Sequence, residues 1–204
     1  KLIRINPQSG IQSIITKWSL TSGPKDIVIE SNGQILVAGT GIEKIGDINY
    51  VVGAIYRVDP ISGSYSIVSL GGELGELFGI ALDEMGNIFV TSGIWTASGS
   101  KYQIVKVNAS TGSQSVLSNL DPYNLRGIDV DVKGDLIVTA GGTSSGLLLR
   151  VDPVTGAHEV ISRGLDSPEG VTTTCVTTNH VTPQPPRPNH PKTMPWIPLL
   201  FTDD

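Results

Sequence analysis

The stretch Arg57-Val58-Asp59-Pro60-Ile61-Ser62-Gly63 decides the fold, because its pattern occurs four times along the chain. Each copy begins with a basic residue, a β-branched residue and Asp or Asn, and ends with Ser or Thr followed by Gly. The other copies are Arg4-Ile5-Asn6-Pro7-Gln8-Ser9-Gly10, Lys106-Val107-Asn108-Ala109-Ser110-Thr111-Gly112 and Arg150-Val151-Asp152-Pro153-Val154-Thr155-Gly156. Asp and Asn side chains hydrogen-bond to nearby backbone, and Gly tolerates the positive φ of a tight reversal. Each copy therefore predicts a turn between two strands.

A second pattern alternates with the first. An apolar run meets an acidic residue, Gly follows three positions later, and another apolar run begins. The copies are residues 26–37, 79–90 and 127–138, with the beginning of a fourth at 170–174. This arrangement is typical of a β-hairpin. Asp129 lies inside the third copy, and the repeat does not explain it.

Together the two patterns predict four short strands in each period of 44 to 53 residues, as the glycine positions 10, 63, 112 and 156 show. Four-stranded units of this length are typical of β-propeller blades. The predicted fold is therefore an all-β propeller of four-stranded antiparallel blades, with full blades at about 26–69, 79–118 and 127–162. Residues 2–17 supply two outer strands, and 170–178 supply an inner strand. The two pieces either form a fourth blade shared between the termini, or the blades belong to a larger ring of six or seven.

The composition changes after residue 178. Seven of the 13 prolines lie between Pro183 and Pro198, which favours extended polyproline conformation. We expect two parts, blades over 1–178 and a Pro-rich tail over 179–204. The tail is either a solvated linker or a segment that docks through apolar residues such as Trp196.

Charge and cysteine content exclude several classes of function. The net charge is -5, which removes the attraction to phosphate on which nucleic-acid and anionic membrane binding depend. A single cysteine, Cys175, excludes an intrachain disulfide framework. The missing initiator Met and the richness in Thr, Ser and Gly predict a secreted or extracytoplasmic protein.

The turn Arg150 to Gly156, together with Gly79-Ile80-Ala81-Leu82-Asp83-Glu84-Met85-Gly86-Asn87-Ile88-Phe89-Val90, resembles blades of the NHL and SMP-30/gluconolactonase-like propeller superfamily. The resemblance covers residues 2–174. Members include calcium-dependent lactonases, a streptogramin lyase that uses a His, an acidic residue and magnesium, and non-catalytic scaffolds. It implies a fold and does not choose among these activities.

Candidate binding residues come from two places in the predicted blades. Residues immediately before each inner strand differ in charge while the scaffold repeats, and they are Lys25, Phe78, Arg126 and Glu169. The loops between the second and third strands of a blade, residues 39–53 and 92–103, carry the aromatic residues Tyr50, Trp95 and Tyr102. Such loops on a rigid scaffold are common binding positions.

No residue is predicted to be catalytic. None of the motifs above is a nucleophile elbow or a phosphate-binding loop. His158 is expected on an outer strand, and His180 and His190 flank the tail. Glu169 resembles the acidic residue that binds metal in SMP-30-like lactonases, but Arg126 and Lys25 beside it would repel a cation.

The sequence therefore predicts a non-catalytic binding and assembly module without a cofactor. Its expected partner is a protein, a polymer or a second copy, engaged through the loops, the tail or blade completion. The alternative is a metal-dependent lactonase or lyase of the SMP-30 or streptogramin-lyase type that acts on a small molecule in the central funnel. In that case Glu169 would bind Ca²⁺ or Mg²⁺, and Arg126 or Lys25 would bind an anionic group of the substrate.

Overall fold

The computed structural model of the chain describes residues 1–17, 23–97, 99–141 and 145–174. These residues form strands and turns without a helix, so no helix long and apolar enough to cross a membrane occurs among them. Cys175 lies outside the described residues, and so does the whole Pro-rich tail with His180, His190 and Trp196.

Three four-stranded antiparallel sheets confirm the predicted blades, with strand order equal to chain order in each. Blade 1 is β3 (Asp26–Ile29), β4 (Ile35–Ile45), β5 (Ile48–Val58) and β6 (Tyr65–Leu70). Blade 2 is β7 (Glu76–Leu82), β8 (Asn87–Thr96), β9 (Gly99–Asn108) and β10 (Gln114–Asn119). Blade 3 is β11 (Asn124–Val130), β12 (Leu136–Gly141), β13 (Gly146–Val151) and β14 (His158–Leu165).

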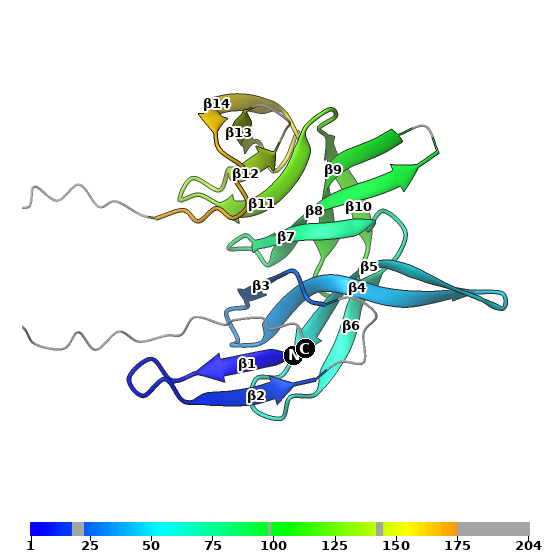
Figure 1. The fold of residues 1–204 in the computed structure, drawn as a ribbon, viewed down its shortest axis with the longest axis vertical. Helices are drawn as coiled ribbons and strands as arrows, with labels where there is room; N and C mark the ends of the chain where they lie inside the picture. The colour runs from blue at the N-terminus through cyan, green and yellow to red at the C-terminus, as the bar shows by residue number, and fades with distance from the viewer. Residues whose placement is uncertain (18–22, 98, 142–144, 175–204) are drawn as a thin grey trace, which may run out of the picture.

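The blades stand in an open arc (Figure 1), and along its inner side the first strand of blade 2, β7, contacts both β3 and β11. Apolar side chains fill the spaces between neighbouring blades. Leu36, Leu77 and Val105 pack between blades 1 and 2, whereas Phe89 and Leu136 belong to the cluster between blades 2 and 3. Burial between sheets thus holds the arc together.

The two predicted outer strands at the N-terminus are β1 (Leu2–Ile5) and β2 (Gln12–Thr16), which pair only with each other. They pack against blade 1, where Leu2 joins a cluster with Val37 and Tyr56. The Arg4 guanidinium also donates a 3.0 Å hydrogen bond to the Pro60 carbonyl in blade 1. This hairpin therefore occupies the position of the outer half of a preceding blade.

The inner strand expected from residue 170 is not formed by the described residues, which end at 174. This segment runs beside β11 instead, and the Thr173 N–H donates to the Asp129 carboxylate at 2.6 Å. The Thr173 hydroxyl donates to the Val130 carbonyl at 2.7 Å. These contacts explain Asp129, which binds the segment after blade 3 through its side chain.

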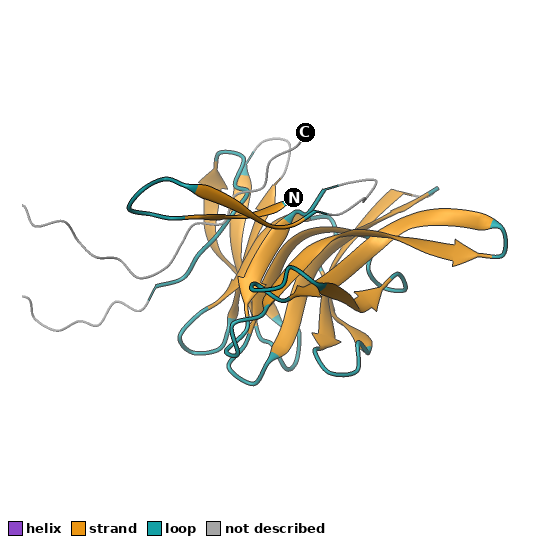
Figure 2. Ribbon diagram, turned by 90° about the horizontal axis from the view of Figure 1, so that it is seen from below, coloured by secondary structure: helices purple, strands orange, loops and turns teal. Residues whose placement is uncertain are grey.

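The prediction of loops at 39–53 and 92–103 is wrong in detail, because both stretches continue the strands. In blade 1, β4 and β5 pair up to Ile45 opposite Ile48, and the reversal occurs at Gly46, whose φ is 62°. β-branched residues facing each other across the pair favour this extension. The hairpin projects beyond the rest of its blade in both views (Figure 1, Figure 2).

Candidate functional site

A pocket of about 370 Å³ opens among the starts of the inner strands. Its charged and aromatic lining residues are Lys25, Asp26, Glu76, Phe78, Arg126 and Glu169. The backbone of 127–128 and 170–171 completes it. The structure therefore brings together all four residues that the sequence places before an inner strand. Within the described residues, only Lys25 directly precedes one, because β7 and β11 begin earlier than predicted and include Phe78 and Arg126.

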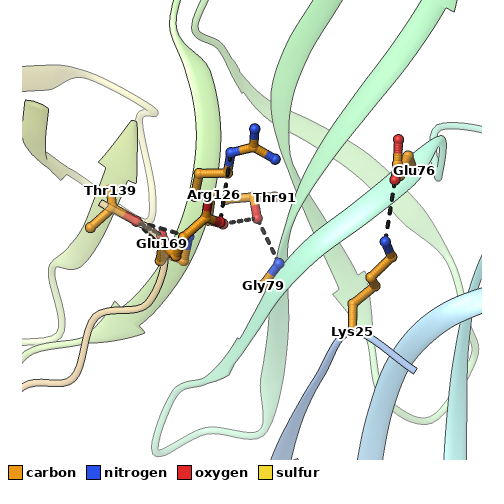
Figure 3. Close-up of polar contacts among 8 residues, drawn as sticks. Lys25, Glu76, Gly79, Thr91, Arg126, Thr139 and Glu169 are labelled. Carbon is orange, nitrogen blue, oxygen red and sulfur yellow. Dashed lines mark hydrogen bonds and ion pairs between the residues drawn. The ribbon is translucent and has the colours of Figure 1, made fainter. Parts of the chain in front are cut away.

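The repeated scaffold holds this part of the backbone through a Gly and a Thr that face each other across the first two strands of a blade (Figure 3). In blade 2 the Thr91 hydroxyl accepts from Gly79 N–H and donates to the carbonyl of Arg126. In blade 3 the hydroxyl of Thr139 does the same between Gly127 N–H and the carbonyl of Glu169. Arg126 and Glu169 are thus fixed by hydrogen bonds from the preceding blade.

Two ion pairs cross the pocket wall. The Lys25 ammonium lies 3.4 Å from a Glu76 carboxylate oxygen, and Arg126 Nε lies 3.8 Å from a Glu169 oxygen. The Glu169 side chain is 74% exposed and that of Lys25 is 41% exposed. Such solvent-exposed pairs contribute little to stability, so both cations remain available to a ligand.

Aromatic side chains connect the pocket to the β8–β9 hairpin. Phe78 and Tyr102 have ring centroids 6.3 Å apart, and Tyr102 and Trp95 meet edge to face at 6.0 Å. The Trp95 indole N–H donates to Glu76 at 3.3 Å, while 60% of this residue is exposed. The two predicted aromatic residues therefore form a wall beside the pocket and are not part of its lining.

Asp26 is a pocket residue that the sequence analysis missed. Its carboxylate accepts hydrogen bonds from Ile27 N–H at 2.8 Å and from Ile80 N–H of the next blade at 2.9 Å. Burial raises the pKa of this carboxyl above its ordinary value, the two backbone donors oppose the rise, and the charge of Asp129 adds to it. A raised pKa favours a carboxylate that can accept a proton.

A signal for Asp26 was present in the repeat. Aligned copies of the hairpin place Gly79 and Gly127 at its position. A carboxylate that replaces glycine at the start of an inner strand departs from the scaffold pattern. Glu76, also missed, had no such signal, because its contacts with Lys25 and Trp95 depend on the placement of different strands.

The remaining sequence candidates lie away from the pocket or outside the described residues. Tyr50 lies on the projecting hairpin, opposite Glu43. His158 lies on β14 as expected and meets Tyr123 edge to face at 6.3 Å. Trp196 falls in the tail that the structure does not describe.

The donor set around the pocket does not fit a metal ion. Among the described residues, no three His, Cys, Asp or Glu side chains lie close enough to share a cation. Glu76 and Glu169 each pair with a basic residue, and Ca²⁺ requires six or more oxygen ligands. Within the described residues, Glu169 therefore lacks partners for the metal role considered from the sequence.

Solved structures with the same fold match most of the chain, whereas no family model and no curated protein sequence matches it. A gluconolactonase from Xanthomonas campestris superposes with a TM-score of 0.60 at 15% identity, covering 83% of this chain and 57% of that one. A calcium-binding protein, regucalcin, from Agrobacterium tumefaciens superposes with a TM-score of 0.52 at 15% identity. The match covers 79% of this chain and 58% of that one. The periplasmic gluconolactonase of Pseudomonas aeruginosa superposes with a TM-score of 0.51 at 18% identity. The match covers 74% of this chain and 46% of that one.

These matches confirm the resemblance to SMP-30/gluconolactonase-like propellers at the level of the fold. The chain spans about half the length of each of these structures. The prediction of a non-catalytic binding and assembly module is contradicted, because neighbours with this fold are described as gluconolactonases. The lactonase-like alternative agrees better with them.

Proposed function

We propose that the protein binds a small lactone in the inner-strand pocket and hydrolyses it. The observation that carries the proposal is the pocket itself, which combines two basic side chains with the half-buried carboxylate of Asp26. Its volume of about 370 Å³ suits a small molecule. The gluconolactonases that share the fold support the choice of reaction.

The chemistry assigned to the chain needs a base and a stabilising cation. Asp26 takes a proton from water, whose oxygen forms a bond to the lactone carbonyl carbon. The Lys25 ammonium stabilises the negative charge that develops on the carbonyl oxygen. When the ring C–O bond breaks, the leaving alkoxide receives the proton from Asp26, and a hydroxy acid is the product.

No step is routed through a metal, since the described donors do not fit one. Regucalcin is described as calcium-binding, so metal dependence belongs in the experiment. Hydrolysis is measured after EDTA treatment and again with added CaCl₂ or MgCl₂. Activity that survives EDTA supports the assignment to Asp26 and Lys25, and activity that requires the added ion contradicts it.

Proton release from a panel of sugar and aliphatic lactones, D-gluconolactone among them, tests the reaction. We expect Asp26→Asn to lower kcat by about 100-fold or more, the usual contribution of general base catalysis. Lys25→Gln is expected to lower it by about tenfold or more, as for loss of a charge-stabilising donor. The matched controls Asp47→Asn and Lys44→Gln, both exposed on the β4–β5 hairpin, retain full activity. Hydrolysis of every lactone at the buffer rate would exclude the function.

An extracytoplasmic location is part of the proposal. One neighbour is a periplasmic gluconolactonase, which supports it. Fractionation of the source cells with an antibody against this chain tests the location, and recovery in the cytosolic fraction alone contradicts it.

A further inference from the structure

The Arg126 side chain is held in one orientation at the β11 side of the pocket. Its Cζ lies 5.0 Å from the centroid of the Phe78 ring, which places the guanidinium over the ring face. Its Nε lies 3.8 Å from Glu169. Its backbone carbonyl accepts the hydrogen bond from Thr91. These contacts fix both the backbone and the plane of the guanidinium.

The outer end of this guanidinium has unused hydrogen-bond donors. Neither Nη1 nor Nη2 of Arg126 makes a hydrogen bond within the described part of the chain, although the side chain is only 30% exposed. Figure 3 shows these two nitrogens beyond the Nε contact with Glu169. Neither nitrogen is among the buried side-chain atoms that lack a partner. Water can therefore hydrate both donors, and an acceptor group on a ligand in the pocket can replace it.

We infer that Arg126 binds a carboxylate on the substrate, so that the preferred lactone carries a carboxylate away from its ester group. This inference rests on the proposed lactone hydrolysis. A planar guanidinium with two parallel N–H groups matches a carboxylate in a two-point contact, whereas an ammonium offers only a point charge.

The charge of the surrounding pocket disfavours more than one negative charge on the ligand. Asp26, Glu76 and Glu169 contribute carboxylates to the lining, against the two cations Lys25 and Arg126. A doubly charged phosphate would face stronger repulsion from these carboxylates than a carboxylate would. Lys25, paired with Glu76 on the other side of the pocket, remains for the ester carbonyl.

Two lactones that differ at one group test the inference in the reaction. D-Glucarolactone carries a carboxylate where D-gluconolactone carries a hydroxymethyl group. Wild-type protein is expected to show the higher kcat/KM for D-glucarolactone. Arg126→Gln is expected to lower that value by roughly tenfold or more and to lower the value for D-gluconolactone much less, so that the preference is lost. Arg126→Lys keeps the charge but loses the two-point contact, so it should recover only part of the preference.

Binding supplies a readout that does not depend on catalysis. By calorimetry, D-glucuronate, which carries a carboxylate in place of the hydroxymethyl group of D-glucose, is expected to bind wild-type protein, and neutral D-glucose is expected to bind much more weakly. Arg126→Gln should remove this difference. Phe78→Leu, which keeps the charge but removes the ring under the guanidinium, should reduce it. Arg163→Gln, an exposed arginine on β14, should leave it unchanged.

The outcomes separate this inference from the proposed function. If no lactone is hydrolysed but D-glucuronate binds through Arg126, the function fails and the carboxylate site stands. If lactones are hydrolysed and Arg126→Gln keeps the wild-type preference, the function stands and the inference is overturned. An equal loss of binding in the Arg163 control, or full activity of Arg126→Lys, would also overturn it.

Discussion

At the scale of single residues, the repeated Asp or Asn before each outer turn has the same role in all four copies. Its side-chain oxygen accepts from the backbone N–H groups two and three positions later, as Asp59 does from Ile61 and Ser62 at 2.8 Å. Asn6, Asn108 and Asp152 make the corresponding contacts. These donors hold the pKa of Asp59 and Asp152 below its ordinary value.

The lowered pKa of these two groups predicts a pH effect on stability. A carboxyl whose pKa is depressed by folding stabilises the native state above its ordinary pKa, and this contribution is lost as pH falls through the folded value. The double variant Asp59→Asn, Asp152→Asn should fold at neutral pH, because Asn already fills the position in two copies. It should lose less stability than wild type between pH 7 and about pH 3 in urea titrations. Equal losses in the two proteins would contradict the assignment.

The pKa of Asp26 shifts in the opposite direction. Its pKa is raised mainly by burial, so the native state gains stability as pH falls through the folded pKa and loses it as pH rises. Asp26→Asn removes the buried charge, and its amide oxygen can still accept from Ile80 N–H. Its free energy of unfolding should equal or exceed that of wild type at neutral pH, and the difference should shrink as pH falls and Asp26 takes up a proton. An Asp26→Asn protein that is less stable than wild type at neutral pH and regains that stability at alkaline pH would refute this.

At the scale of strands and turns, three of the repeated turn glycines are also contact points between blades. A Cβ on Gly63, Gly112 or Gly156 would overlap a carbonyl oxygen of the preceding outer strand, at Ile15, Val68 and Leu117 respectively. Each also has φ near 70°. The same residue thus closes its turn and permits the close approach of its neighbour.

Alanine substitutions separate these two roles. Gly86→Ala, at φ 81° with open space around it, should cost about 1 kcal/mol for the backbone conformation alone. Gly112→Ala adds overlap with the Val68 carbonyl and should cost about 3 kcal/mol or more. Chemical denaturation of the two variants measures the difference. Equal losses of stability in the two variants would mean that the strand carrying Val68 moves away from the added methyl group without cost.

The Gly and Thr that connect neighbouring blades are replaced together in blade 1, where Asp26 lies opposite Ala38. Asp26 makes the contact to the next blade through its carboxylate. We therefore expect Asp26→Gly and Ala38→Thr each to destabilise the protein, and the double variant to recover part of the loss. A double-mutant cycle should give a coupling of about 1 kcal/mol or more. If the two single losses of stability simply add in the double variant, the Gly–Thr pair and the Asp26–Ala38 pair are not equivalent.

At the scale of the whole molecule, blade 2 lies between two four-stranded blades, whereas within the described residues blade 1 has only the β1–β2 hairpin on its other side. Blade 2 contributes Leu77 and Val105 to the cluster shared with blade 1, and Phe89 to the cluster shared with blade 3. In repeat proteins, stability depends on contacts between neighbouring units. Backbone amides of β7, β8 and β9 should therefore exchange with deuterium most slowly, and those of β1 and β2 much faster. Slowest exchange in β1 and β2 would disprove this order.

Local chemistry explains why so much of the fold could be predicted. The Asx turns, the hairpin glycines and the alternating apolar runs depend on residues a few positions apart, so the sequence alone determined the blades and their order. It also identified Lys25, Phe78, Arg126 and Glu169, because each stands directly before a copy of the hairpin repeat.

The tertiary structure decided the contacts between blades. The ion pair of Lys25 with Glu76, the stacking of Arg126 on Phe78 and the binding of Ile80 N–H by Asp26 each join residues about 50 positions apart. Asp129 likewise contacts Thr173 across 44 positions. Such contacts depend on the rotation from one blade to the next, which is set by side-chain packing between sheets and is not encoded in any local pattern.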